Sequence, residues 1–244
     1  MVERETIVEV APQSEKARIA HLLRKMEEVY TLVPKTVCEN CGACCSLTDE
    51  EFGGDYATMY PLYAIEYVYI SQYILRNFDK EQQHKYFSLT EERPKRCPFR
   101  NDERGGCHIY PARPLICRTY GVLSSERIME AVDRYREVVP GKWLVRFLRV
   151  EKNAVCPKVK VLEEEKLEQH TEYMVAGAYV QRLVKLSTDI DICEGPQREV
   201  LLETVRRSPI WWSWGGYNVL RFSSVEWFQR EFPEYWQAAY LVDR

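Results

Sequence analysis

Four cysteines fall within eight consecutive positions of this chain, in the stretch CENCGACC at residues 38–45. They are Cys38, Cys41, Cys44 and Cys45, so the spacing is Cys-x2-Cys-x2-Cys followed at once by a fourth thiol. Two intervening residues form a short turn that lets consecutive sulfurs converge on one metal centre. The functions open to such a segment are disulfide bonding, zinc binding, iron–sulfur cluster binding and thiol catalysis.

The other five cysteines are spread over the rest of the chain, at Cys97, Cys107, Cys117, Cys156 and Cys193. The first residues carry two acids among five positions and lack the apolar segment of a secretory signal. The longest apolar stretch, 60–75, falls short of the roughly 20 residues needed to cross a bilayer. We therefore expect a cytoplasmic protein without a membrane span. In a reducing compartment disulfides are disfavoured, which leaves metal or redox chemistry.

The charge balance excludes a strong electrostatic attraction to nucleic acid. The chain has 34 basic and 37 acidic residues, a formal net charge of −3, and no long run of one sign. No phosphate-binding glycine loop, paired acidic motif or serine–histidine–aspartate arrangement points to a specific reaction. We expect no nucleic-acid and no membrane partner. A protein or redox partner stays open, as does the oligomeric state.

Local sequence around the thiols favours metal ligation. Cys97 and Cys156 each precede a proline, as the closing ligand of ferredoxin-type clusters often does. Gly42 allows a tight or left-handed turn among the first thiols. In extended backbone Cys44 and Cys45 point in opposite directions, so we expect each to face a different centre, or one to be structural. Without Cys193, interpreted as a core residue, eight thiols suit two four-thiolate centres, or one centre with several unligated thiols.

Three residues in or directly after the second cysteine segment, CHIYPARPLIC at 107–117, are further candidates for the site. Arg113 and Arg118 are candidate cofactor-binding residues, because positive charge beside thiols lowers their pKa and offsets thiolate charge. The alternative for both is ordinary salt bridging at the surface. His108 is a candidate metal ligand. Its alternative is a hydrogen-bonding or exposed histidine.

Hydrophobic spacing predicts a mainly α fold, with irregular cysteine-rich metal-binding loops packed on a helical domain and at most a small β element. Helices are expected over 13–31, 58–77, 125–139 (capped by Ser124 or Ser125), 160–187 and 197–207, and a strand or hairpin arm over 142–150. The expected regions are an N-terminal helix (1–34), a cysteine-cluster metal-binding domain (35–160) and a helical, aromatic-rich C-terminal region packed on the same core (161–244).

The stretches CENCGACC, CPF and CHIYPARPLICRTYG resemble the CxxCxxCC family of zinc- or iron-chelating cysteine-cluster domains. The similarity covers residues 35–121 and extends toward the Cys-Pro pair at 156–157. It implies metal ligation by Cys38, Cys41, Cys44, Cys45, Cys97, Cys107 and Cys117, with Cys156 as an eighth ligand. A related cysteine pattern in a flagellin lysine N-methylase implies that some relatives are enzymes, yet this chain lacks a glycine-rich turn for a nucleoside cofactor.

Three functions remain after this comparison. The first is a metal-binding protein with one or two iron–sulfur clusters of the [4Fe-4S] type, in electron transfer, sensing or chemistry. The second is a zinc-stabilised structural or interaction module, although zinc sites usually pair two close cysteine hooks and the downstream half offers none. The third is a metal-dependent enzyme whose site is lined by Tyr110, Tyr120, His108, Arg113 and Arg118. The first is the expected function.

Overall fold

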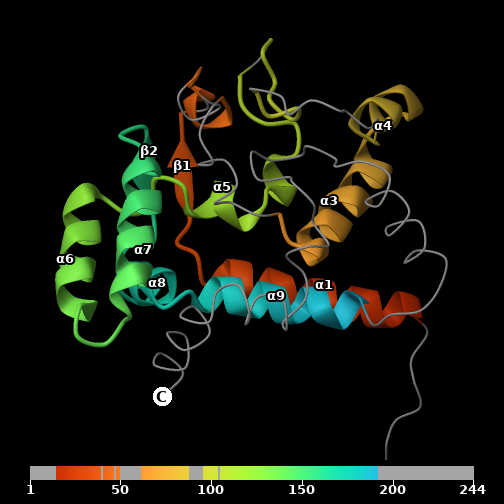
Figure 1. Ribbon diagram of the computed structural model, residues 1–244. Helices are drawn as coiled ribbons and strands as arrows, with labels where there is room; N and C mark the ends of the chain where they lie inside the picture. Colours follow the sequence, from red (N-terminus) through yellow and green to blue (C-terminus); the bar gives the residue numbers. More distant parts are fainter. Residues whose placement is uncertain are drawn as a thin grey trace, which may run out of the picture.

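The computed structural model describes residues 15–39, 41–46, 48–49, 62–87, 96–103 and 105–191. Regular structure in these ranges is helical apart from one two-stranded sheet, so the fold is mainly α with a small β element, as the sequence predicts (Figure 1). The α-helices are α1 (Glu15–Thr31), α3 (Ala64–Asn77), α4 (Lys80–Phe87), α5 (Leu115–Thr119), α6 (Ser125–Tyr135), α7 (Gly141–Asn153), α8 (Leu167–Val175) and α9 (Ala178–Asp191). The strands are β1 (Thr36–Cys38) and β2 (Val159–Val161), and the 3₁₀ turns are η1 (Ala43–Cys45), η3 (Tyr110–Ala112) and η4 (Glu164–Lys166).

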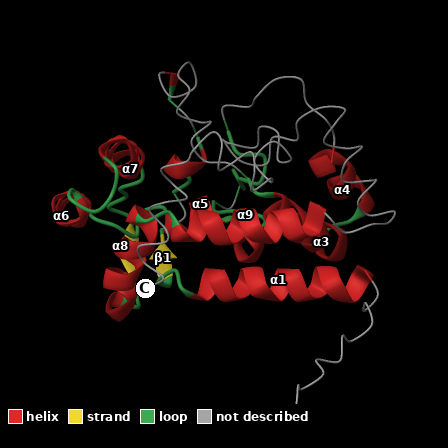
Figure 2. Cartoon of the chain, turned by 60° about the horizontal axis from the view of Figure 1, so that its bottom comes forward, coloured by secondary structure: helices red, strands yellow, loops and turns green. Residues whose placement is uncertain are grey.

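Helices α1, α3 and α9 build the larger of two hydrophobic cores. Helices α1 and α9 lie side by side in both views, and α3 contacts each of them (Figure 1 and Figure 2). The buried side of α1, within the helix predicted over 13–31, is formed by Ile19, Leu22, Leu23, Met26 and Tyr30. These residues recur every three or four positions and so share one side of the helix. None of the helices that the structure describes is both long enough and apolar enough to span a bilayer.

Helices α6, α7 and α8 surround the second, smaller core. Helix α6 begins after Ser124, whose hydroxyl accepts a hydrogen bond from the backbone N–H of Arg127 at 3.3 Å, which confirms the predicted helix and its cap. Ile128 of α6 and Phe147 of α7 are buried against each other's helices in this core. Because α8 also contacts α9, the second core adjoins the first.

The strand or hairpin arm predicted over 142–150 is wrong, because this segment is helix α7. Its buried residues, Leu144 and Phe147, are three positions apart, whereas Val145 between them is 68% exposed. Burial at a three-residue interval is the pattern of a helix face, and alternation in a strand would have buried Val145 together with Phe147. Pro140 is the N-cap residue of this helix.

The single long helix predicted over 160–187 is also wrong. Strand β2 occupies its first residues, and α8 and α9 then form two separate helices. Gly177 lies between them with φ 67°, a left-handed conformation that ends α8 and that glycine adopts without strain. The helix predicted over 197–207 and the tryptophan-rich C-terminal segment lie outside the described residues.

Strands β1 and β2 bring two distant cysteine segments together. They pair antiparallel, with Thr36 opposite Val161 and Cys38 opposite Val159. The backbone N–H of Glu39 extends the contact by donating to the carbonyl of Lys158 at 3.3 Å. Cys38 is consequently held beside the turn that carries Cys156.

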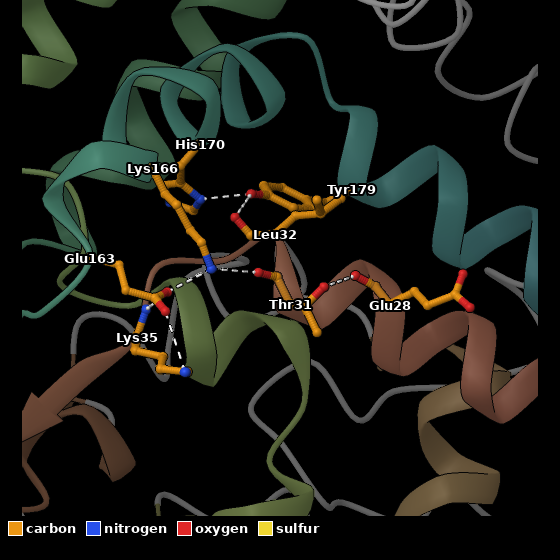
Figure 3. Close-up of polar contacts among 8 residues, drawn as sticks. All are labelled: Glu28, Thr31, Leu32, Lys35, Glu163, Lys166, His170 and Tyr179. Atoms are coloured by element: carbon orange, nitrogen blue, oxygen red, sulfur yellow. Dashed lines mark hydrogen bonds and ion pairs between the residues drawn. The ribbon is translucent and has the colours of Figure 1, made fainter.

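A group of polar contacts fixes the end of α1 and the start of β1 (Figure 3). Lys166 Nζ donates to the carbonyl of Thr31 at 3.0 Å and to the carboxylate of Glu163 at 2.8 Å. Glu163 also accepts from the backbone N–H of Lys35 at 3.0 Å. The C-terminal end of a helix carries partial negative charge, so an ammonium group is favourable there. These bonds set the path by which the chain enters the cysteine segment.

Candidate metal centre

Every cysteine that the structure describes lines one and the same cavity. The eight are Cys38, Cys41, Cys44, Cys45, Cys97, Cys107, Cys117 and Cys156. All eight are free thiols, and the cavity has a volume of about 90 Å³. The cavity walls come from β1, η1, α5 and the turn before β2, segments up to about half of the chain apart. Cys193 lies outside the described residues.

Gly42 shapes the turn that presents Cys44 and Cys45. Its backbone has φ 70° and ψ 11°, the left-handed conformation predicted for this position. The guanidinium of Arg100 packs directly against its α-carbon and donates to its carbonyl oxygen. Arg100 is in turn anchored by Asp102, which accepts from Nε at 2.6 Å. The turn is therefore held from outside by a side chain of the next cysteine segment.

The Cys44–Cys45 pair differs from the prediction of opposite side-chain directions. The prediction assumed extended backbone, but both residues lie in the 3₁₀ turn η1, where successive side chains are not on opposite sides. A hydrogen bond joins the two thiols, and this bond, followed by burial, raises the pKa of Cys44. Two thiols in contact can each reach the same cavity.

Backbone bridges fasten the Cys97 and Cys107 segment to that turn. The N–H of Cys97 donates to the carbonyl of Cys45 at 2.8 Å, beside an isolated antiparallel bridge between Ser46 and Arg96. A second bridge pairs Arg100 with Cys107. Cys97 and Cys107 pack against the larger hydrophobic core on their other side. Their sulfurs thus lie between the core and the cavity.

Cys117 is placed by α5, and a buried carboxylate from α3 holds this helix. Glu66, which is 1% exposed, accepts a hydrogen bond from the N–H of Leu115 at 2.6 Å, at the first residue of α5. It also accepts from the hydroxyl of Tyr30 at 2.7 Å. Burial raises the pKa of Glu66, and the hydrogen bonds from Leu115 and Tyr30 oppose this rise. Nothing in the spacing of the sequence identified Glu66.

Cys156 is held at the other end of the cavity. Its carbonyl accepts from the N–H of Val159 at 3.3 Å in the turn that leads into β2. Gly121, with φ 76°, lies so close that a Cβ there would come within 2.9 Å of the Cys156 Cβ and 2.8 Å of a Val159 methyl. The N–H of Gly121 donates to the carbonyl of Ala154 at 2.7 Å. Only glycine fits this contact between the segment after α5 and the Cys156 turn.

Three thiols of the cavity, those of Cys97, Cys107 and Cys117, are poorly solvated. Burial raises the pKa of Cys97 to about 12, and burial also raises the pKa of Cys107 and Cys117. The residue Cys117 nevertheless has a large solvent-accessible surface and is classed as exposed. Because Cys117 lines the cavity, we assign its accessible surface to the cavity wall. Deprotonated thiols at these positions require a compensating positive charge.

Arg113 is placed to supply that charge. It lines the cavity, and its positive charge opposes the pKa rise at Cys44, Cys107 and Cys117. Its guanidinium carbon lies 4.1 Å from the centre of the Tyr110 ring, while its buried Nε has no hydrogen-bond partner within the described ranges. A buried guanidinium N–H facing several thiols suits an anionic group in the cavity.

Arg118 and His108 are placed away from the cavity lining. Arg118 donates to the carbonyls of Arg113 at 2.8 Å and Pro111 at 2.7 Å, with its guanidinium over the Tyr30 ring. It supports the Arg113 segment, and its cofactor-binding role stays a prediction. His108 is exposed and makes an edge contact with the Phe78 ring, in line with the non-ligand interpretation. Tyr110 and Tyr120 do line the cavity.

The donor set fits a thiolate-bound metal, although the thiols are not already gathered around a point. Among the residues that the structure describes, no three His, Cys, Asp or Glu side chains form a group arranged to hold a metal ion. Ligation of a metal therefore requires the thiols to move, and rotation about χ1 is one movement that shifts a cysteine sulfur without the backbone. Thiolate sulfur is the ligand that zinc and iron–sulfur clusters prefer. The residues present fit such a group.

The family comparison agrees with this chemistry. Residues 37–135 match the model of the CxxCxxCC family, described as "Putative zinc- or iron-chelating domain", which confirms the resemblance seen in the sequence over this range. The match supports a metal-binding cysteine cluster for zinc or iron. It includes seven of the eight cavity cysteines and ends before Cys156. Neither the curated proteins nor the solved structures contain a match to this chain.

Proposed function

We propose that this protein binds iron–sulfur clusters of the [4Fe-4S] type, one or two per chain, and uses them for electron transfer. The observation that carries the proposal is the gathering of eight free thiols on one cavity beside the unpartnered Nε of Arg113. A cluster with thiolate ligands is an anion, so a buried guanidinium stabilises it. When bound, the cluster supplies a site that accepts and releases single electrons.

The size of the cavity favours a cluster over a single ion. Its volume of about 90 Å³ is about six times the roughly 15 Å³ that one ordered water requires, so a group of several atoms can enter. A structural zinc ion is instead enclosed by its four ligands. The chain's own residues would hold the cluster through cysteine sulfur, with Arg113 donating toward it and apolar residues such as Phe99 and Ile109 excluding water.

The alternative is a zinc-stabilised structural module. It is favoured by how little regular structure joins the cysteine segments in the described part of the chain. The isolated bridge between Ser46 and Arg96 joins the first segment to that of Cys97 and Cys107, and the short β1–β2 pair joins the first segment to the turn of Cys156. Zinc would fasten such loops together, and its binding free energy would become folding free energy. Under this alternative the protein has no redox activity.

Purification without oxygen, followed by metal and sulfide analysis, tests the proposal. A cluster protein is expected to be brown, to absorb near roughly 400 nm, and to contain about four irons and four acid-labile sulfides per cluster. Reduction with dithionite should bleach the absorbance. A colourless protein with stoichiometric zinc would establish the alternative, and a metal-free protein after reconstitution with either metal would overturn both.

A further inference from the structure

We propose that exposed cations of α7 and of the strand that follows it form a docking surface for an acidic electron-transfer protein. We call this surface the basic face, and its members are Lys142, Arg149, Lys152, Lys158 and Lys160. The choice of a redox partner rests on the proposed function. Binding of an acidic protein to the basic face does not depend on which metal the cysteine cavity holds.

Positive charge is concentrated in residues 142–160. This range holds six of the chain's 34 basic residues and one of its 37 acidic residues, so its net charge is +5. The single acid, Glu151, is buried. Because the whole chain has a net charge of −3, the residues outside this range carry −8. The charge of the chain is therefore strongly segregated although its total is small.

The cations of α7 lie on the side of the helix that is turned away from the second core. Lys142, Arg149 and Lys152 are all exposed, and intervals of seven and three positions place them on one side of a helix. Val145, which is 68% exposed, lies on the same side. The buried residues of α7 pack into the second core. The outward side of α7 thus combines three cations with one apolar residue.

The other two lysines lie on the far side of the Cys156 turn, through which α7 leads into β2. Lys158 and Lys160 are exposed, and Lys160 is paired across the sheet with Val37, which is 53% exposed. Paired residues of an antiparallel sheet project from the same face. Cys156 lines the cysteine cavity and lies four positions after Lys152 and two before Lys158. A partner bound to the basic face is therefore close to the candidate metal centre.

The four lysines of the basic face are available to a partner. None of them forms an ion pair with another residue in the described ranges, whereas Arg134 and Arg136 of the neighbouring α6 each pair with an acid. Exposed acids border the strand side of the face, namely Glu39 directly after β1 and Glu164 and Glu165 of η4. An acidic partner is attracted to the lysines and repelled at these borders, which restricts its orientation.

A protein fits the basic face better than a membrane or a nucleic acid does. A helix that lies in a membrane surface inserts its apolar side, but the apolar side of α7 is buried in the second core. A long polyanion such as DNA would also meet the rest of the chain, whose net charge is −8. A compact acidic protein can contact the basic face alone, and small, transient interfaces are typical of electron-transfer complexes.

Isothermal titration calorimetry of the full chain with acidic electron carriers tests the proposal. The first probe is a strongly acidic plant-type [2Fe–2S] ferredoxin, and the second is an acidic flavodoxin. We expect binding at about 10 mM salt that weakens at least about tenfold at about 150 mM, because salt screens exposed charges. Lys142→Glu combined with Lys152→Glu should weaken binding at least about tenfold at the lower salt concentration. Lys158→Glu combined with Lys160→Glu should have an effect of the same size.

The matched control reverses two lysines far from the basic face. Lys80→Glu combined with Lys85→Glu makes the same change in net charge at exposed positions of α4, which lies on the opposite side of the molecule from α7 in both views (Figure 1 and Figure 2). We expect its affinity to stay within about twofold of the wild type, because distant charges are screened. Circular dichroism identifies variants that fail to fold, and the pair on the basic face that stays folded then carries the test.

Three results would overturn the docking surface. The first is that neither probe binds at low salt, and the second is that the control loses as much affinity as the variants of the basic face. The third is that the face binds anionic phosphatidylserine vesicles or duplex DNA and neither acidic protein competes. A zinc protein that binds both probes would contradict the proposed function, and with it the redox nature of the partner, while confirming an acidic-protein site. An iron–sulfur protein that binds neither would do the reverse.

Discussion

The carboxylate of Glu66 lies 2.6 Å from the backbone nitrogen of Leu115, and both residues are buried. This hydrogen bond joins α3 to the first residue of α5, and Cys117 is two residues further along. A carboxylate at a helix N-terminus also interacts favourably with the partial positive charge there. Glu66 is therefore a positioning residue for the inner wall of the cysteine cavity.

Replacing Glu66 with alanine should destabilise the protein strongly. The change leaves the Leu115 N–H, the Tyr30 hydroxyl and the Tyr63 N–H without their acceptor. Buried donors without partners cost roughly 1–3 kcal/mol each, so we expect the free energy of unfolding to fall by roughly 3–5 kcal/mol. Urea unfolding of the metal-free chain measures the change directly.

Tyr30→Phe is the matched control for Glu66. It removes one donor and leaves the Glu66–Leu115 bond in place, so the expected loss is about 1 kcal/mol. Metal content should fall in Glu66→Ala and stay full in Tyr30→Phe. Equal stability losses in the two variants would show that the bond to Leu115 carries no special weight.

Gly42→Ala should distort the turn that carries Cys44 and Cys45. The left-handed backbone costs roughly 1–2 kcal/mol for a residue with a Cβ, and the new methyl would overlap the Arg100 guanidinium. We expect a loss of at least about 1 kcal/mol in unfolding free energy together with reduced metal content. Gly141→Ala is the control, because nothing lies within 4 Å of a Cβ at that position. Loss of metal in the control as well would assign the effect to something other than the turn.

If the protein binds the iron–sulfur cluster that we propose, Arg113→Met should lower the reduction potential of that cluster. Removing a positive charge that faces the thiols favours the oxidised form, and about 1.4 kcal/mol of lost interaction corresponds to about 59 mV for one electron. We expect a negative shift of that order in a redox titration followed by absorbance. Arg134→Met makes the same change in net charge on the exposed surface of α6 and should leave the potential unchanged. A shift of equal size in both variants would contradict a local role of Arg113.

The buried carboxyl of Glu151 should make stability fall as pH rises. Burial raises its pKa to about 8, above the ordinary value of 4.5 that it has in the unfolded chain. Its contribution is therefore complete below pH 4.5 and is lost as pH increases through about 8, by an amount on the order of 4–5 kcal/mol. Glu151→Gln should consequently be more stable than the wild type at pH 9, measured by urea unfolding.

The exposed Glu130 on α6 is the control for Glu151. Glu130→Gln should shift stability by less than about 0.5 kcal/mol at any pH, because a solvated carboxylate loses little on substitution. Differences between each variant and the wild type cancel the pH dependence that metal binding itself contributes. A Glu151→Gln variant with the same pH profile as the wild type would mean that the carboxyl is not held protonated.

The elements that were predicted well from the sequence are those whose apolar residues follow a single periodicity throughout. Helix α1 repeats its apolar residues every three or four positions from Ile19 to Tyr30, so no other structure competes. In α7, the alternation of Val145 with Phe147 competes with the helical spacing of Leu144 and Phe147. Only the burial of Leu144 and the exposure of Val145 decide between them, and burial depends on which helix packs against the segment.

The sequence predicts which type of ligand lines the site, but not which other residues hold the ligand-bearing segments in place. Thiol spacing identifies candidates because a turn of two residues has few geometries. Glu66 has no such local signature, since its partners Tyr30 and Leu115 are 36 and 49 positions away in the chain. Gly121 likewise has to be glycine only because Cys156 and Val159 lie so close to it. Contacts between distant segments are set by tertiary packing, which spacing does not encode.

His170 should make the protein sensitive to acid below its ordinary pKa. It is fully buried on α8, and burial lowers its pKa from 6.5 to about 3. The Tyr179 hydroxyl donates to the Leu32 carbonyl at 3.2 Å, so it accepts the Nδ1 proton of the neutral imidazole at 2.9 Å (Figure 3). The other ring nitrogen is buried with no partner in the described part of the chain, and a proton added there would have no acceptor.

Because the folded chain binds this proton more weakly than the unfolded chain, the stabilisation is present above pH 6.5 and is lost as pH falls toward 3. His170→Asn keeps a polar atom near the Tyr179 hydroxyl and removes the titration. We expect the variant to be less stable than the wild type at pH 8, since it leaves a small cavity, and the difference to shrink by at least about 2 kcal/mol by pH 4. His21→Asn, at an exposed position of α1, should follow the wild-type profile throughout. A constant difference between His170→Asn and the wild type from pH 8 to pH 4 would show that His170 is protonated in the folded protein.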